Sequence, residues 1–247
     1  MDIPRARSAL GGTLSAVEME RLAAVHVRSP EIRSEAMAVA GAWAAGPGYY
    51  PEDVDVLFHD GDLRIDGDLR TGVEPRRIGM LVVHGDLIVG GLLEDSLDPE
   101  SLIVVTGDLR AGNLITEGWL EVQGDVVIDG CVLFEDNECS AHVLGDLTAG
   151  LIFTKYHHVE VGGRVIAPLI AGDHRRIESP HDFAFVDDTH PSLVPLLVPQ
   201  VLSIDGDGTG EYGEDWFLDY VDSRAMADLV RAGRSPLRAG GPGGLAG

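Results

Sequence analysis

A glycine–aspartate step set between apolar residues recurs along the middle of this 247-residue chain, in segments such as VHGDL, VTGDL and VLGDL. Successive steps are separated by 18, 22, 17, 21 and 18 residues. A unit this short cannot bury a core alone and must stack on its neighbours, so the repeat constrains the fold more than any other feature. The glycines of the six steps are Gly67, Gly85, Gly107, Gly124, Gly145 and Gly163.

Around each step the apolar residues alternate with other residues, which is the period of a β-strand. Leu81, Val83 and Leu87 would share one face, and this places the glycine between them on the inward face. Each repeat has room for one or two further short strands, too few for a propeller blade. The sequence therefore predicts a mainly β fold, a single-stranded parallel β-helix of about six coils stacked about 4.8 Å apart.

The aspartates of the steps would form a row along the stack. Neighbours about 4.8 Å apart repel by about 0.9 kcal/mol per pair even in water. Turn aspartates commonly accept backbone N–H groups, so we expect each carboxylate to cap a corner of its coil. A cation-binding ladder is the alternative, but the nine-residue repeat of calcium-binding β-rolls is missing. The row consists of Asp68, Asp86, Asp108, Asp125 and Asp146, with Arg164 in the sixth coil.

The segments on either side of the repeat carry different signals. Ser15 and Glu18 form a capping box, which favours a helix over AVEMERLAAVHV that could cover the first coil. Pro195 and Pro199 indicate that LVPLLVPQVL is extended or an edge strand. A helical end piece follows and stops at Gly233. The predicted divisions are an N-terminal helical cap over 1–48, the β-helix over 49–173, a C-terminal covering segment with a helix over 174–238, and a disordered tail over 239–247.

The charge balance restricts the choice of partner. Eighteen basic and 41 acidic residues give a net charge of −23, so nucleic acid and anionic membranes are poor partners. A basic protein would instead be attracted. No apolar run is long enough to span a membrane, the N-terminus lacks a secretion signal, and Cys131 and Cys139 form no disulfide framework. We therefore expect a cytoplasmic location.

Motifs of catalysis and of cofactor binding are missing from the sequence. It contains no G-x-S-x-G, no H-E-x-x-H and no phosphate-binding loop, so we expect no enzymatic activity and no cofactor. The loop from Asp205 to Glu211 resembles the first half of an EF-hand, but Trp216 stands where a bidentate glutamate is required. An acidic turn is favoured there, and cation binding by this loop or by the aspartate row stays open.

Two acidic insertions and one aromatic-histidine loop are the candidate contact surface. Insertions on one face of a repeat protein often bind its partner. Adjacent histidines in a strand point to opposite faces, and no third ligand has suitable spacing, so no metal site is predicted. The predicted partner-binding residues are Glu94, Asp95, Asp98, Glu135, Asp136, Glu138, Tyr156, His157 and His158.

The VxGDL coils over residues 55–170 resemble those of the bactofilin family and of other short β-helix proteins described as polymer-forming cytoskeletal proteins. That resemblance implies a β-helix and, for bactofilins, end-to-end polymerisation through bare ends. The segments flanking the coils here differ from the short flexible tails of that family. The whole arrangement also resembles bacterial β-helix immunity proteins of polymorphic toxin systems, which implies neutralisation of a cognate toxin by binding.

Taken together, these observations predict a non-enzymatic protein-binding module, an acidic immunity (antitoxin-like) protein that occludes a basic toxin domain as a monomer or small oligomer. A bactofilin-like filament or scaffold protein is the alternative. A left-handed β-helix acyltransferase is the second alternative, because Gly61 and Gly67, like Gly85 and Gly91, are six residues apart. The two-residue alternation argues against a strict hexad repeat.

Overall fold

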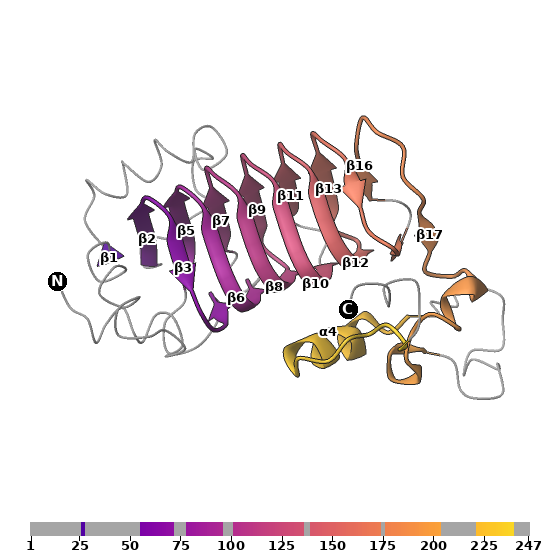
Figure 1. Cartoon of the computed structure of the whole chain (residues 1–247). Coiled ribbons are helices and arrows are strands. Elements are labelled where there is room, and N and C mark those ends of the chain that lie inside the picture. Colours follow the sequence, from indigo (N-terminus) through magenta and orange to yellow (C-terminus); the bar gives the residue numbers. More distant parts are fainter. Residues whose placement is uncertain are drawn as a thin grey trace.

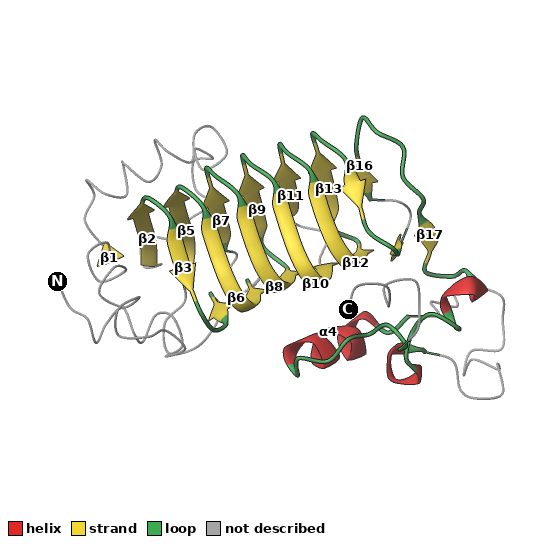
Figure 2. Ribbon diagram, in the orientation of Figure 1, coloured by secondary structure: helices red, strands yellow, loops and turns green. Residues whose placement is uncertain are grey.

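The computed structural model describes residues 26–27, 55–71, 78–95, 101–135, 139–173, 176–203 and 221–239. In these ranges the chain winds into a parallel β-solenoid of about five turns, which confirms the predicted fold (Figure 1). Strands dominate, and the α-helix of the described residues lies in the C-terminal segment (Figure 2). No helix among the described residues is both long and apolar enough to cross a membrane.

The solenoid has two sheets, and each coil contributes to both. All strand pairs within them are parallel except β1 with β2. The first sheet contains, in order, β1 (His26–Val27), β2 (Asp55–Asp60), β5 (Ile78–His84), β7 (Leu102–Val105), β9 (Trp119–Val122), β11 (Ser140–Val143), β13 (His158–Val161) and β16 (Ile177–Glu178). The second contains β17 (Val186–Asp187), β15 (Ile170–Gly172), β12 (Leu147–Lys155), β10 (Val126–Glu135), β8 (Leu109–Thr116), β6 (Leu87–Glu94) and β3 (Leu63–Ile65), with β14 (Val165–Ile166) beside β12 and β4 (Leu69–Arg70) beside β6.

Each coil turns three corners. A glycine–aspartate step joins a strand of the first sheet to one of the second, as Gly107-Asp108 joins β7 to β8. The long strands of the second sheet then bend at a further glycine, where the pairing of β10 with β12 shifts register between Ile128 and Cys131. A third corner returns the chain to the first sheet. Inside these corners, inward apolar side chains of successive coils lie above one another, and most of them are fully buried.

The aspartates at the first corner form the expected ladder of backbone caps. The Oδ1 atom of Asp86 accepts the N–H of Asp108 at 2.8 Å, and Asp108 accepts that of Asp125 at 3.0 Å. The same bond joins Asp125 to Asp146 and Asp146 to Arg164, whose guanidinium also lies 2.6 Å from the Asp146 carboxylate. Hydrogen bonds from Arg164 hold the pKa of Asp146 below its usual value. A backbone donor thus offsets the repulsion within the row.

The ladder begins at Gly61-Asp62. The prediction that Gly67-Asp68 is its first step is wrong. Asp62 accepts the N–H of Asp86 at 3.0 Å across 24 residues. Asp68 belongs to the second corner, where it accepts the N–H of Leu92 at 2.9 Å. The sequence motif misleads here because both corners place an acceptor side chain directly after a glycine.

The glycines of the first corner do not face inward as the alternation predicted. They lie half-buried at the corner, and a side chain at these positions would point along the solenoid axis into the preceding coil. A Cβ atom added to Gly107 would overlap the carboxylate of Asp86 and would lie 2.8 Å from the backbone of Gly85. Glycine is required because each coil and its capping aspartate approach the next coil too closely for any side chain.

Two aromatic residues cover the C-terminal end of the stack. Residues 179–185 connect β16 to β17, the last strands of the two sheets, and carry Phe183 and Phe185 against the core. The apolar interior at this end is therefore partly covered by residues of the same chain. Among the described residues, β16 and β17 remain the last strands of their sheets.

The predicted C-terminal helix is α4 (Ser223–Arg231), followed by Gly233 with a φ of +68°. It packs against the side of the solenoid rather than its end. Met226 and Leu229 join a second apolar cluster with outward residues of the second sheet, such as Phe153. The stretch with Pro195 and Pro199 is not extended, because it forms the short 3-10 helices η2 (Pro191–Leu193) and η3 (Pro199–Val201) and a turn between them.

Several predictions for the flanks fall on residues outside the described ranges. These are most of the N-terminal cap, the Asp205 to Glu211 loop and the tail beyond residue 239. The two described residues of the predicted N-terminal helix form the strand β1, antiparallel to β2. The helix prediction is wrong at these two residues, because they pair with the edge of the first sheet.

The capping role of the ladder predicts a difference between two substitutions of Asp108. Asp108→Ala removes the acceptor and should lower the free energy of unfolding by about 1–2 kcal/mol. Asp108→Asn retains an acceptor oxygen and removes one charge from the row, so its loss should stay below about 0.5 kcal/mol. Urea denaturation measures both. Equal losses, together with destabilisation of the unmutated chain by a chelator, would favour a cation ladder instead.

Candidate functional site

The outer face of the first sheet changes from apolar to acidic along the stack. One outward position, here called the outer row, is in register from β5 to β16. Val82 and Val104 are buried at 0% and 2% exposed, whereas the glutamates at the other end are exposed. The C-terminal half of this face therefore presents polar groups. The outer row consists of Val82, Val104, Glu121, His142, Glu160 and Glu178.

A buried carboxylate holds the histidine in the middle of the row. The Nδ1 atom of His142 lies 2.6 Å from Oε1 of Glu121, whose side chain is 8% exposed. Burial raises the pKa of Glu121, and the hydrogen bond with Glu121 raises the pKa of His142. Because the carboxylate is the acceptor, Nδ1 carries the proton and the ring orientation is fixed. The Nε2 atom of His142 lies 3.9 Å from Oε2 of Glu160.

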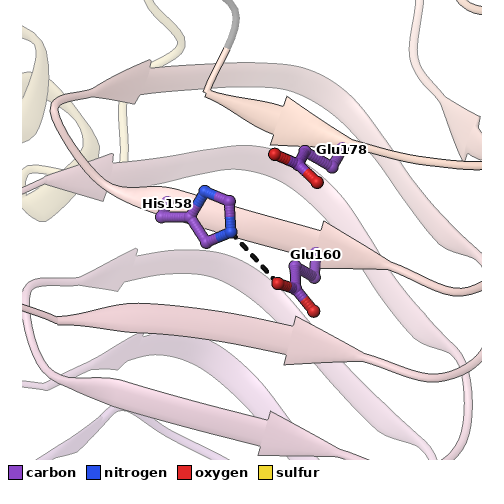
Figure 3. A group of neighbouring side chains, drawn as sticks. All are labelled: His158, Glu160 and Glu178. Carbon is purple, nitrogen blue, oxygen red and sulfur yellow. Dashed lines mark hydrogen bonds and ion pairs between the residues drawn. The ribbon is translucent and has the colours of Figure 1, made fainter.

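Two side chains at the end of the row, Glu160 and Glu178, meet a third, His158 (Figure 3). His158 and Glu160 lie two residues apart on β13 and share its outer face, and Nε2 of His158 is 3.2 Å from Oε1 of Glu160. Glu178 on β16 is paired directly with Glu160. One ligand atom from each residue lies within 4.8 Å of the others. These three residues, the outer-face cluster, are close enough to share one cation.

An open groove of about 380 Å³ runs beside the outer-face cluster. Leu144, which is 64% exposed, supplies an apolar surface next to the carboxylates. The walls of the groove are formed by β11, β13 and β16 and by the turn after β16, so strand backbone shapes the groove. The groove is lined by His142, Leu144, Glu160, Gly162, Glu178 and Pro180, among others.

The structure places Glu94 and Glu135, both predicted to bind a partner, next to the C-terminal helix. Oε1 of Glu94 accepts a hydrogen bond from Arg231 of α4 at 2.7 Å, and its Oε2 lies 3.3 Å from Nε of Arg70. Glu135 lines a hollow of about 510 Å³ beside α4, and burial raises its pKa. Glu94 thus joins the solenoid to α4, and Glu135 lies at the same junction.

Asp95, another predicted contact residue, is buried at 3% exposed. Its Oδ1 accepts the backbone N–H groups of Glu117 and Gly118 at 2.7 and 2.9 Å, and its Oδ2 lies 2.7 Å from the Thr116 hydroxyl. Burial raises its pKa to about 7 in spite of these hydrogen bonds. Asp95 therefore holds the third corner of the next coil and lies beneath the surface.

The Tyr156-His157-His158 stretch divides between the two faces. His157 is fully buried, stacks on Phe134 with 5.7 Å between ring centroids, and its Nδ1 lies 2.9 Å from the carbonyl of Glu135. Tyr156 is 47% exposed, with a φ of +65°. His158 points outward into the outer-face cluster. The remaining predicted contact residues, Asp98, Asp136 and Glu138, lie outside the described residues.

Sequence reasoning missed Glu121, His142, Glu160 and Glu178. A signal for three of them was present, because Glu121, His142 and Glu160 each stand three residues before the glycine of their own step. Stacking the repeats on those glycines would have aligned them on the outer face. The closeness of Glu178 to His158 was not visible as a spacing motif, because strand pairing across coils brings Glu178 next to Glu160.

Comparison with protein-family models, with curated proteins and with solved structures finds no match to this chain.

Burial of Asp95 predicts a pH dependence of stability. The folded-state pKa of about 7 lies above the ordinary 3.8, so the folded state binds more protons between these values. Stability should therefore fall as the pH rises through this window, by at most about 4 kcal/mol, and level off above it. Asp95→Asn keeps the acceptor for both backbone N–H groups and should remove this slope.

Urea denaturation of both proteins between pH 5 and pH 8 measures the effect. Groups that titrate in both proteins contribute equally, so the difference between the two curves isolates Asp95. Parallel curves would show that Asp95 stays ionised in the folded state throughout this range.

Proposed function

We propose that this chain is a non-enzymatic protein-binding solenoid that takes a basic protein partner on the outer face of its first sheet. The observation that carries this proposal is the groove beside the outer-face cluster, where Glu160 and Glu178 adjoin the exposed Leu144. An apolar anchor beside charged groups is the composition of a protein interface. Rigid strands support the face, so little conformational entropy is lost when a partner binds.

Electrostatics favours a basic partner. The chain carries a net charge of −23, and the exposed carboxylates of the outer row concentrate negative charge at one place. Such a field raises the association rate of a cationic protein and repels nucleic acid and anionic membranes.

In its most specific form, the proposed partner is a toxin domain that this chain neutralises by occlusion. This form rests on the resemblance of the coils and flanks to β-helix immunity proteins. The filament alternative is less well supported, because Phe183 and Phe185 pack against the apolar core at the C-terminal end of the stack. A partly covered end favours a monomer or a small oligomer over end-to-end assembly.

The proposal predicts a position-dependent effect of charge reversal. The products of adjacent genes, beginning with basic ones, would be tested for binding by surface-based kinetics in the presence of a chelator. Glu160→Lys should lower the association rate constant about tenfold, since it reverses a charge on the binding face. Asp129→Lys is the control, because Asp129 is exposed on β10 of the other sheet and the change in net charge is the same.

Equal effects of the two substitutions would place the binding face elsewhere. Failure of every adjacent gene product to bind would remove the immunity-type proposal. Higher salt should weaken association of the unmutated chain and narrow its difference from the Glu160→Lys protein.

A further inference from the structure

The outer-face cluster places two carboxylates directly opposite each other on neighbouring strands. Glu160 and Glu178 are paired residues of β13 and β16, and like charges in this position destabilise a sheet. His158 lies beside them on the same face, with its Nε2 atom facing Glu160. A cation between the three groups would replace the repulsion by attraction. The backbone of all three residues is held in regular strand pairing.

The spacing of the ligand atoms suits one metal ion. Bonds of about 2.0–2.1 Å to nitrogen and oxygen, in tetrahedral geometry, place neighbouring ligand atoms about 3.3 Å apart. Nε2 of His158 and Oε1 of Glu160 are already 3.2 Å apart. All three donors lie within 4.8 Å of one another, so small side-chain rotations would complete the set.

A second observation on the same face points to metal chemistry. His142 adjoins Glu160 at 3.9 Å through Nε2, and its Nδ1 atom is fixed by the buried carboxylate of Glu121. This carboxylate–imidazole pairing is the arrangement that orients histidines at metal centres, with the ring nitrogen opposite the carboxylate directed at the ion. Glu121 is 6% exposed and is therefore held firmly for this role.

We propose that His158, Glu160 and Glu178 bind one divalent transition-metal ion. His142 lies next to Glu160, and Glu121 is the residue that positions His142 there. An imidazole with carboxylates favours Zn²⁺ and related ions over Ca²⁺ and Mg²⁺, which prefer oxygen ligands throughout. This proposal does not rest on the proposed protein-binding function, since it follows from the ligand geometry alone.

Isothermal titration of the full chain with Zn²⁺, after dialysis against a chelator, tests the proposal. The unmutated chain should bind one ion at this site. His158→Gln and Glu178→Gln each remove a ligand and should weaken binding more than tenfold. Asp129→Asn is the matched control, because it removes one exposed carboxylate from the other sheet and should leave affinity within twofold.

Glu121→Gln separates the positioning role from ligation. It leaves the three proposed donors in place but weakens the bond that orients His142 beside Glu160, so affinity should fall by less than the tenfold expected when a donor is lost. Circular dichroism of each variant would verify the fold. Absence of stoichiometric Zn²⁺ binding, or equal affinities of the Glu178→Gln and Asp129→Asn proteins, would overturn the proposal. Binding of Ca²⁺ as tight as that of Zn²⁺ would overturn the assignment of the metal class.

Discussion

The hydrogen bond from each corner N–H to the aspartate of the preceding coil is the interaction on which the solenoid depends. It satisfies a backbone donor where the chain leaves one sheet for the other and would otherwise lack a partner. Its short reach brings successive corners so close that only glycine fits before the aspartate. Glycine and aspartate therefore recur together because each requires the other. Coils of 24, 22, 17, 21 and 18 residues can all stack, because the corner fixes the register and the loops between corners absorb the difference.

The fixed register also aligns the outward-facing side chains of successive coils. Once the corners are aligned, every outward position of one coil lies next to the same position of its neighbours, so any change of residue type along the stack becomes a change of surface. In the outer row, valine on β5 and β7 gives way to glutamate and histidine on the later strands. The chain thereby builds a localised acidic face from residues that are about 20 positions apart in sequence.

The sequence predicted the fold because the repeat and the strand period are both local patterns. The prediction failed where the role of a residue depends on contacts between coils. Gly67-Asp68 matches the motif as well as Gly61-Asp62 does, and only strand pairing assigns the first to the second corner. Glu94 and Asp95 were predicted to be partner-binding residues of an acidic insertion. Instead Arg231, more than a hundred residues later, pairs with Glu94, and Asp95 caps a neighbouring coil. His158 was recognised as a contact residue, but its neighbours Glu160 and Glu178 come together through the sheet.

Carboxylates serve three purposes in this molecule, and their surroundings decide which. The ladder aspartates accept hydrogen bonds from backbone N–H groups, and Asp95 accepts hydrogen bonds from three donors of the next coil. Glu94 is paired with two arginines at the junction with α4. Glu160 and Glu178 differ, because they face each other across a strand pair at the solvent boundary, next to a groove. A charge already compensated inside the fold contributes little to recognition, so we propose external binding at Glu160 and Glu178, where the sheet holds like charges together.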